Sequence, residues 1–151
     1  MHVQANATVA ARPQTSGQDL LRDLKEAHDQ LLAELSVMDR LTAGPLPDVS
    51  LYATTRWRLN RTSRNRRKVI EQAVEKLAAR ASAGDLAVIS KFRSDHPAAV
   101  RQSSEHIFHW SLDAVKQNWA EYCQASNLLR AAMRNRIREE QNALYPILGR
   151  Y

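Results

Sequence analysis

Residues 16–38 read SGQDLLRDLKEAHDQLLAELSVM, and this stretch decides the fold. Ser16, followed three residues later by Asp19, is typical of a capping box at the start of a helix. Hydrophobic residues then recur at alternating steps of three and four, which is the seam of a helix packed in a bundle. The seam positions are Leu21, Leu24, His28, Leu31, Leu35 and Met38. The pattern predicts a long helix and an all-α fold.

A second helix is expected from about Ser50 to Ala83, and its seam is less hydrophobic than the first. Residues 43–50 read AGPLPDVS and predict a loop, in which Asp48 or Ser50 can cap the following helix. Gly84 should end the second helix, because glycine weakens helices.

The third and fourth helices are expected on either side of Ser111. Pro97 should kink the third helix or begin a new turn after His96, because proline cannot continue the hydrogen bonding of a helix interior. A continuous last helix over residues 112–148 would contain 37 residues and be about 55 Å long.

Four amphipathic helices with short connections predict an up-and-down four-helix bundle with a long C-terminal helix. His28 and His96 lie 68 positions apart, and Arg66 and Arg136 lie 70 apart, which indicates two helical hairpins related by duplication. We expect residues 16–151 to form a single domain and residues 1–15 to be a disordered arm.

The composition narrows the classes of protein to which the chain could belong. A chain of 151 residues with 44% hydrophobic and 25% charged residues is typical of one globular domain. The single cysteine, Cys123, cannot form an internal disulfide. The N-terminal residues lack the pattern of a secretion signal, and no stretch reaches the ~18 apolar residues of a membrane span. We therefore expect a cytoplasmic protein with no membrane partner.

Several short motifs resemble the hemerythrin-like, or HHE cation-binding, family. Residues 136–148 read RIREEQNALYPIL, which is similar to that family's His-Ile-x-x-Glu-Glu-x-x-Leu-Phe-Pro-Leu-Leu. His28 ahead of two leucines resembles the first histidine of the family, and Asp95 followed by His96 resembles its acid-histidine pair. The resemblance implies a four-helix bundle in which five histidines and two carboxylates hold two iron ions that bind or sense oxygen.

The resemblance preserves three of the seven implied ligands, His28, His96 and Glu140. The other four positions hold Arg66, Ile70, Val100 and Arg136. Guanidinium groups repel metal ions and cannot deprotonate to bind them. We therefore expect no intact di-iron site and no cofactor; the alternative is a residual iron or zinc site formed by the three matching residues.

The arginines suggest what replaces the metal. A buried Glu140 without a partner would be unstable, whereas Arg66 or Arg136 can satisfy it with charge-assisted hydrogen bonds. We therefore predict a polar cluster in the core formed by Arg66, Arg136, Glu140 and His28.

The net charge of +6 comes from one segment. Residues 56–68 hold seven of the 22 basic residues and no acid, and outside this segment 15 bases face 16 acids. Arg66 is expected to point inward, and the remaining six form a predicted basic surface: Arg56, Arg58, Arg61, Arg64, Arg67 and Lys68. This surface is interpreted as a solvated face, as a site for an acidic protein partner, or, less favoured, as a nucleic-acid site.

These observations lead to one functional prediction and two alternatives. The sequence contains no nucleophile with an oriented base and no phosphate-binding glycine loop, so a non-enzymatic regulatory or protein-interaction module is expected. The alternatives are an oxygen or redox sensor with a residual metal site, and nucleic-acid binding through the basic second helix.

Overall fold

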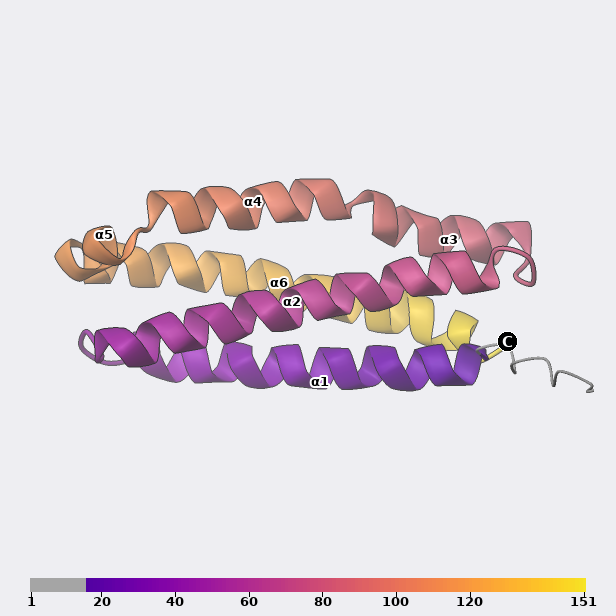
Figure 1. Ribbon diagram of the computed structural model, residues 1–151, viewed down its shortest axis with the longest axis horizontal. Helices are drawn as coiled ribbons and strands as arrows, with labels where there is room; N and C mark the ends of the chain where they lie inside the picture. Colours follow the sequence, from indigo (N-terminus) through magenta and orange to yellow (C-terminus); the bar gives the residue numbers. More distant parts are fainter. Residues whose placement is uncertain (1–15) are drawn as a thin grey trace, which may run out of the picture.

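The computed structural model describes residues 16–151, and the expected arm at residues 1–15 lies outside the described part. Within residues 16–151 the regular structure is entirely helical, which confirms the all-α prediction. Most of the helices run close to the long axis of the molecule (Figure 1). The elements are α1 (Gly17–Thr42), α2 (Val49–Leu77), α3 (Ala83–Ser94), α4 (His96–His109), α5 (Leu112–Gln117) and α6 (Trp119–Leu148).

The first helix begins where the capping pattern predicts. The Asp19 backbone N–H donates to the Ser16 hydroxyl at 3.1 Å, and the Ser16 N–H donates to the Asp19 carboxylate at 3.3 Å. The capping box therefore satisfies two of the N–H groups that have no partner within the helix at this end. Leu20, rather than the predicted Leu21, is fully buried, and the rest of the predicted seam is buried as expected.

The second helix begins near its predicted start but ends earlier than expected. Asp48 accepts hydrogen bonds from the N–H groups of Ser50 and Leu51, so Asp48 is the cap. The helix ends at Leu77 instead of Ala83. Ser82 starts α3 by accepting a hydrogen bond from the backbone of Asp85, so the serine that the prediction placed inside α2 caps the next helix.

Two interruptions divide the second half of the chain. The first lies at Asp95, and Pro97 sits in the first turn of α4, where its missing N–H costs no helix hydrogen bond. The second lies at Asn118, so the prediction of one continuous helix over residues 112–148 is wrong. The break places Val115 and Trp119 against the same aromatic cluster and lets the Trp119 indole donate to the Gly44 carbonyl at 3.0 Å.

The helices pack unequally. α1 packs against α2 and α6, while α3 packs against the same two helices, and α5 folds onto α6. α4 packs more loosely than the others, and His96, its first residue, is its only buried residue. Figure 1 shows α4 running along one edge of the molecule.

Three hydrophobic clusters fill the core. The largest joins α1, α2, α3 and α6 through residues such as Leu24, Leu77 and Ile89. An aromatic cluster around Tyr52 and Tyr122 lies at the opposite end, and Leu31, Leu35 and Ile137 form a smaller group. None of the helices in residues 16–151 is long and apolar enough to cross a membrane.

Candidate functional site

A buried carboxylate, Glu140, lies at the centre of a charged cluster. Its side chain is fully buried on α6. His28 of α1 lies 2.8 Å from Oε1, while Arg66 of α2 and Arg136 of α6 both donate to Oε2, the latter at 3.2 Å. Three helices thus supply the four residues that the sequence analysis grouped together.

His28 links the carboxylate to Tyr145. Its Nε2 faces Glu140, and its Nδ1 lies 2.6 Å from the Tyr145 hydroxyl. An ionised carboxylate can only accept, so Nε2 carries the proton, and in the neutral imidazole Nδ1 accepts from the tyrosine. The sequence analysis did not identify Tyr145 as a site residue. It follows Glu140 by five positions, and residues at that spacing do not share a helix face.

Arg136 also joins the cluster to the end of α3. It donates to the Phe92 carbonyl at 2.9 Å and lies 3.7 Å from the Asp95 carboxylate. The last carbonyls of a helix have no partner within the helix, so this guanidinium satisfies one of them. Its stacking on the Phe92 ring, at 5.7 Å from the ring centre, adds a cation–π contact.

The environment keeps Glu140 ionised. Burial by itself would raise the pKa of this carboxyl, but hydrogen bonds from His28 and Arg66 and the positive charge of Arg66 lower the pKa below its usual value. Glu140 is therefore an anion with both oxygens occupied.

His96 lies outside this hydrogen-bonded group. It is only 5% exposed, and neither ring nitrogen has a hydrogen-bond partner among residues 16–151. Burial, followed by the nearby charges of Arg66 and Arg136, lowers the pKa of His96 to about 4. The ring is therefore neutral at physiological pH.

The donor set does not fit a metal ion. One oxygen of Glu140 is hydrogen-bonded to His28 and the other to two guanidiniums. The second ring nitrogen of His28 is hydrogen-bonded to Tyr145. Two cations lie where a metal would need anionic or neutral ligands. Within residues 16–151, no group of three or more histidine, cysteine, aspartate or glutamate residues is arranged to hold a metal, and this includes the candidates His28, His96 and Glu140.

The predicted basic surface is smaller than expected. Arg56 is half-buried and donates to the carbonyls of Trp110 at 2.6 Å and Ile107 at 2.8 Å, so it satisfies the end of α4 instead of facing solvent. Arg67 is also half-buried and donates to the Ser63 hydroxyl at 3.1 Å. The predicted basic residues that remain exposed are Arg58, Arg61, Arg64 and Lys68.

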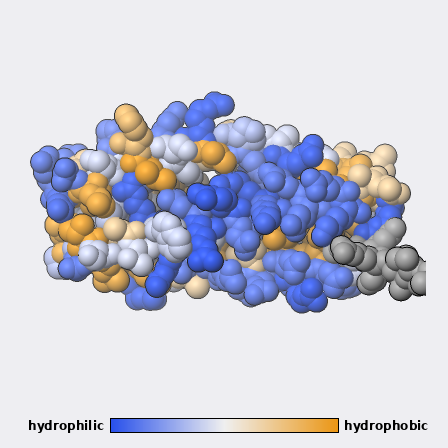
Figure 2. Space-filling model, viewed as in Figure 1, coloured by the Kyte–Doolittle hydropathy of each residue, from blue (hydrophilic) through white to orange (hydrophobic). Residues whose placement is uncertain are grey.

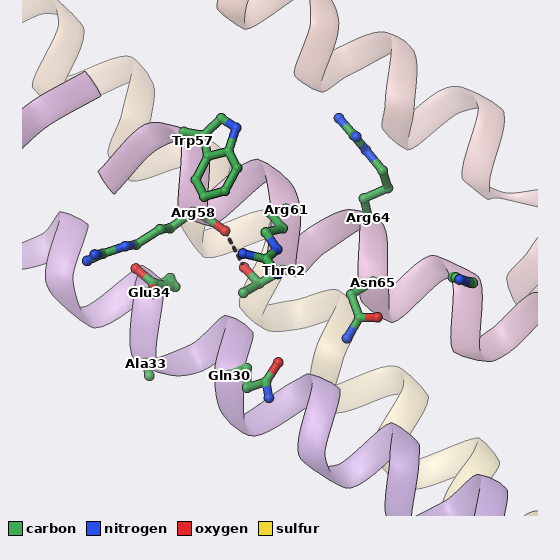
Figure 3. Close-up of a pocket in the computed structure, with 10 residues that line it drawn as sticks. Gln30, Ala33, Glu34, Trp57, Arg58, Arg61, Thr62, Arg64 and Asn65 are labelled. Carbon is green, nitrogen blue, oxygen red and sulfur yellow. Dashed lines mark hydrogen bonds between the residues drawn. The ribbon is translucent and has the colours of Figure 1, made fainter. Parts of the chain in front are cut away.

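These four residues line a groove of about 680 Å³ between α1 and α2. Figure 3 shows Gln30, Ala33 and Glu34 on the α1 side and the arginines on the α2 side. Trp57 stands at one end with 60% of its surface exposed, and the Arg61 guanidinium lies 5.4 Å from its ring centre. The surface over the middle of α2 is strongly hydrophilic (Figure 2).

A second buried arginine was not predicted. Arg130 is 1% exposed, and its Nε donates to Asp39 at 2.8 Å while another nitrogen donates to Thr42 at 2.8 Å. Its position four residues after Ser126, which is also buried on α6, places the two residues on one helix face.

The charged cluster and the basic groove are thus the two sites that the structure offers for a functional interpretation. The chain matches no protein-family model, and neither a curated protein nor a solved structure is significantly similar to it.

Proposed function

We propose that this chain is a non-enzymatic, hemerythrin-like four-helix bundle without an intact di-iron site, and that it binds an acidic segment of a partner protein in the α1–α2 groove. The bundle assignment is supported by long helices that run along one axis (Figure 1) and pack around the buried cluster of Glu140. The loss of the metal site is supported by the arginines bound to Glu140, which use the carboxylate oxygens that iron would need.

The unpaired charge of the groove carries the functional proposal. Arg58, Arg61, Arg64 and Lys68 have no ion-pair partner among residues 16–151, and Glu34 is the one acid that lines the groove. Clustered like charges repel one another, so an anionic ligand relieves the repulsion and is attracted at long range. The exposed Trp57 supplies a large contact area of the type enriched at binding hot spots.

The extent of the groove favours a protein segment over nucleic acid. The basic side chains span residues 58–68, about 15 Å along the helix, which suits a short acidic peptide. A second hollow of about 280 Å³ continues along the same two helices and contains Asp23 and Glu26. A nucleic-acid backbone that followed the groove would bring its phosphates against these acids, whereas a peptide can place neutral or basic residues there.

A direct test measures binding of a fluorescent peptide that contains four glutamates and one aromatic residue. We expect saturable binding that weakens as salt rises and is lost in the triple variant R61E/R64E/K68E. The matched control is R93E/R101E/K116E, which reverses three exposed charges that do not line the groove. This control has the same net charge and should retain binding.

Three results would overturn the proposal. Equal loss of binding in both triple variants would mean that net charge alone attracts the peptide. Tighter binding of single-stranded or duplex DNA than of the peptide at the same salt concentration would favour the nucleic-acid alternative. Elemental analysis giving about two iron atoms per chain would refute the metal-free assignment.

A further inference from the structure

A cavity of about 130 Å³ lies between α2, α4 and α6, on the opposite side of α2 from the α1–α2 groove. Its polar lining comes from Arg66, Arg67 and Arg136, together with Ser63, Gln102 and Ser103, and no carboxylate lines it. Its remaining walls are hydrophobic and come mainly from α6, with one residue each from α1 and α4. Three guanidiniums therefore face a small, partly hydrophobic space.

The positive charge around this cavity is only partly balanced. Glu140 offsets one charge, but both of its oxygens are already used by His28, Arg66 and Arg136. The side chain of Asp95, 3.7 Å from Arg136, is 48% exposed and so largely solvated. Buried charges without a counter-charge are destabilising, so the cavity favours an anion.

One buried donor at the cavity lacks a partner. Arg66 is 4% exposed and lines the cavity, and its Nε–H has no hydrogen-bond partner among residues 16–151. Buried polar groups in proteins are nearly always hydrogen-bonded, so a free guanidinium N–H calls for an acceptor. Burial, followed by the charges of Arg66 and Arg64, lowers the pKa of Arg67, and Glu71 opposes this effect only in part.

We propose that this cavity binds a small organic acid, whose carboxylate is held by Arg66, Arg67 and Arg136 and whose hydrocarbon part contacts Leu31, Leu129 and Met133. Guanidiniums recognise carboxylates through paired N–H donors. The hydrophobic walls favour an organic acid over inorganic phosphate, because phosphate has no apolar surface to bury. A cavity of about 150 Å³ accommodates benzene, so an acid of four to seven heavy atoms is about the right size for this one.

The cavity also has a route to solvent. A neighbouring hollow of about 200 Å³ shares Ser63, Arg67 and Ser103 with it and opens between α2 and α4. α4 is the loosely packed helix of the fold, with His96 as its only buried residue. A ligand can therefore enter between α2 and α4 without separating the tightly packed α1, α2 and α6.

The experiment is a calorimetric titration of the full chain with butyrate, with butyramide as the neutral analogue and inorganic phosphate as the competing anion, all at one ionic strength. We expect one butyrate site per chain and no detectable site for butyramide. The variant R67Q removes one guanidinium that makes no contact with Glu140, and it should weaken butyrate binding by about tenfold or more.

Two further variants separate binding from folding. A99L places a larger side chain in the cavity without changing any charge and should abolish butyrate binding. R101Q removes an exposed arginine from α4 and should leave butyrate binding unchanged. Circular dichroism melting curves establish that each variant is folded.

Each of three outcomes would contradict the proposal. Butyrate and butyramide could bind equally, which would remove the role of the carboxylate. R67Q and A99L could be folded and bind butyrate as tightly as the parent, which would place binding elsewhere. Phosphate could bind more tightly than butyrate, which would replace the organic acid with an inorganic anion.

Discussion

His28 on α1 and Glu140 on α6 are joined by a 2.8 Å hydrogen bond between two side chains that are both fully shielded from solvent. The pair lies 112 positions apart in sequence and connects the first helix to the last. Arg66 adds α2 to the same carboxylate. The charged cluster therefore fixes the relative positions of three helices.

Replacing Glu140 with leucine should strongly destabilise the fold. The variant leaves the buried Arg66 and the largely buried Arg136 without their counter-ion, and loss of one partner of a buried ion pair costs about 3–5 kcal/mol. Guanidinium chloride unfolding of E140L and of the parent measures the difference. The control E139L alters an exposed neighbour and should change the free energy of unfolding by less than about 0.5 kcal/mol. Equal stability of E140L and the parent would mean that the cluster is not formed in solution.

His96 should make the fold less stable as the pH falls from neutrality. Its pKa is about 4 in the folded chain against 6.5 for an unperturbed histidine, so between these values the unfolded chain binds a proton that the folded chain does not. By linkage, the contribution of His96 to the free energy of unfolding is fully present above pH 6.5. It is lost as the pH falls towards 4, and the total loss is up to about 3 kcal/mol. Arg66 and Arg67 on α2 and Arg136 on α6 disfavour the charged ring, and Glu140 favours it.

Unfolding curves recorded at several pH values test this dependence. In H96Q the loss of stability between pH 6.5 and 4.5 should be much smaller than in the parent, whereas H109Q, which removes an exposed histidine, should follow the parent. Parallel pH profiles for H96Q and the parent would show that His96 is accessible to protons in the folded chain.

Local patterns predicted the parts of the fold that depend on local forces. The capping box at Ser16 and the seam of α1 could be read directly, because capping and helical periodicity involve residues within a few positions of one another. The resemblance to the hemerythrin-like family aligned Arg66, Arg136 and Glu140 with ligand positions, and both arginines were expected beside Glu140 because a buried carboxylate needs a donor. The structure places both arginines on that carboxylate.

Tertiary contacts decided the features that the sequence did not reveal. The seam spacing runs through Val115, Trp119 and Tyr122 without interruption, yet the chain leaves the helix at Asn118. Trp119, the first residue after this break, donates from its indole to the carbonyl of Gly44, a residue 75 positions away in the loop before α2. Arg56 was predicted to lie on the basic surface. The two carbonyls to which it donates are more than 50 positions further along the chain, and a local sequence pattern does not reveal such partners.

Arg56 should stabilise the junction between α4 and α5. Its guanidinium donates to the carbonyls of Ile107 and Trp110, and R56Q should lose about 1–3 kcal/mol of stability because hydrogen bonds from a charged donor are lost. Hydrogen exchange of the backbone amides in residues 107–117 should become faster than in the parent. R58Q, which removes an exposed arginine two residues later, should leave both measurements unchanged.

Gly17 should be intolerant of even a methyl group. A Cβ built at this position would overlap the backbone oxygen of Leu148 and lie 2.9 Å from the Cβ of Tyr151, because the start of α1 packs directly against the C-terminal end of the described chain. Backbone atoms cannot move aside as a flexible side chain can, so G17A should lower the free energy of unfolding by about 1–3 kcal/mol.

Gly84 provides the matched control for this substitution. It lies in the first turn of α3, and a Cβ there would meet no atom within 4 Å. G84A should therefore keep or raise stability, by at most about 1 kcal/mol, because alanine favours a helix over glycine. Since the two substitutions add the same methyl group, the difference between their unfolding free energies isolates the packing of α1 against Leu148 and Tyr151. Equal effects would mean that this contact between the two ends of the described chain is absent in solution.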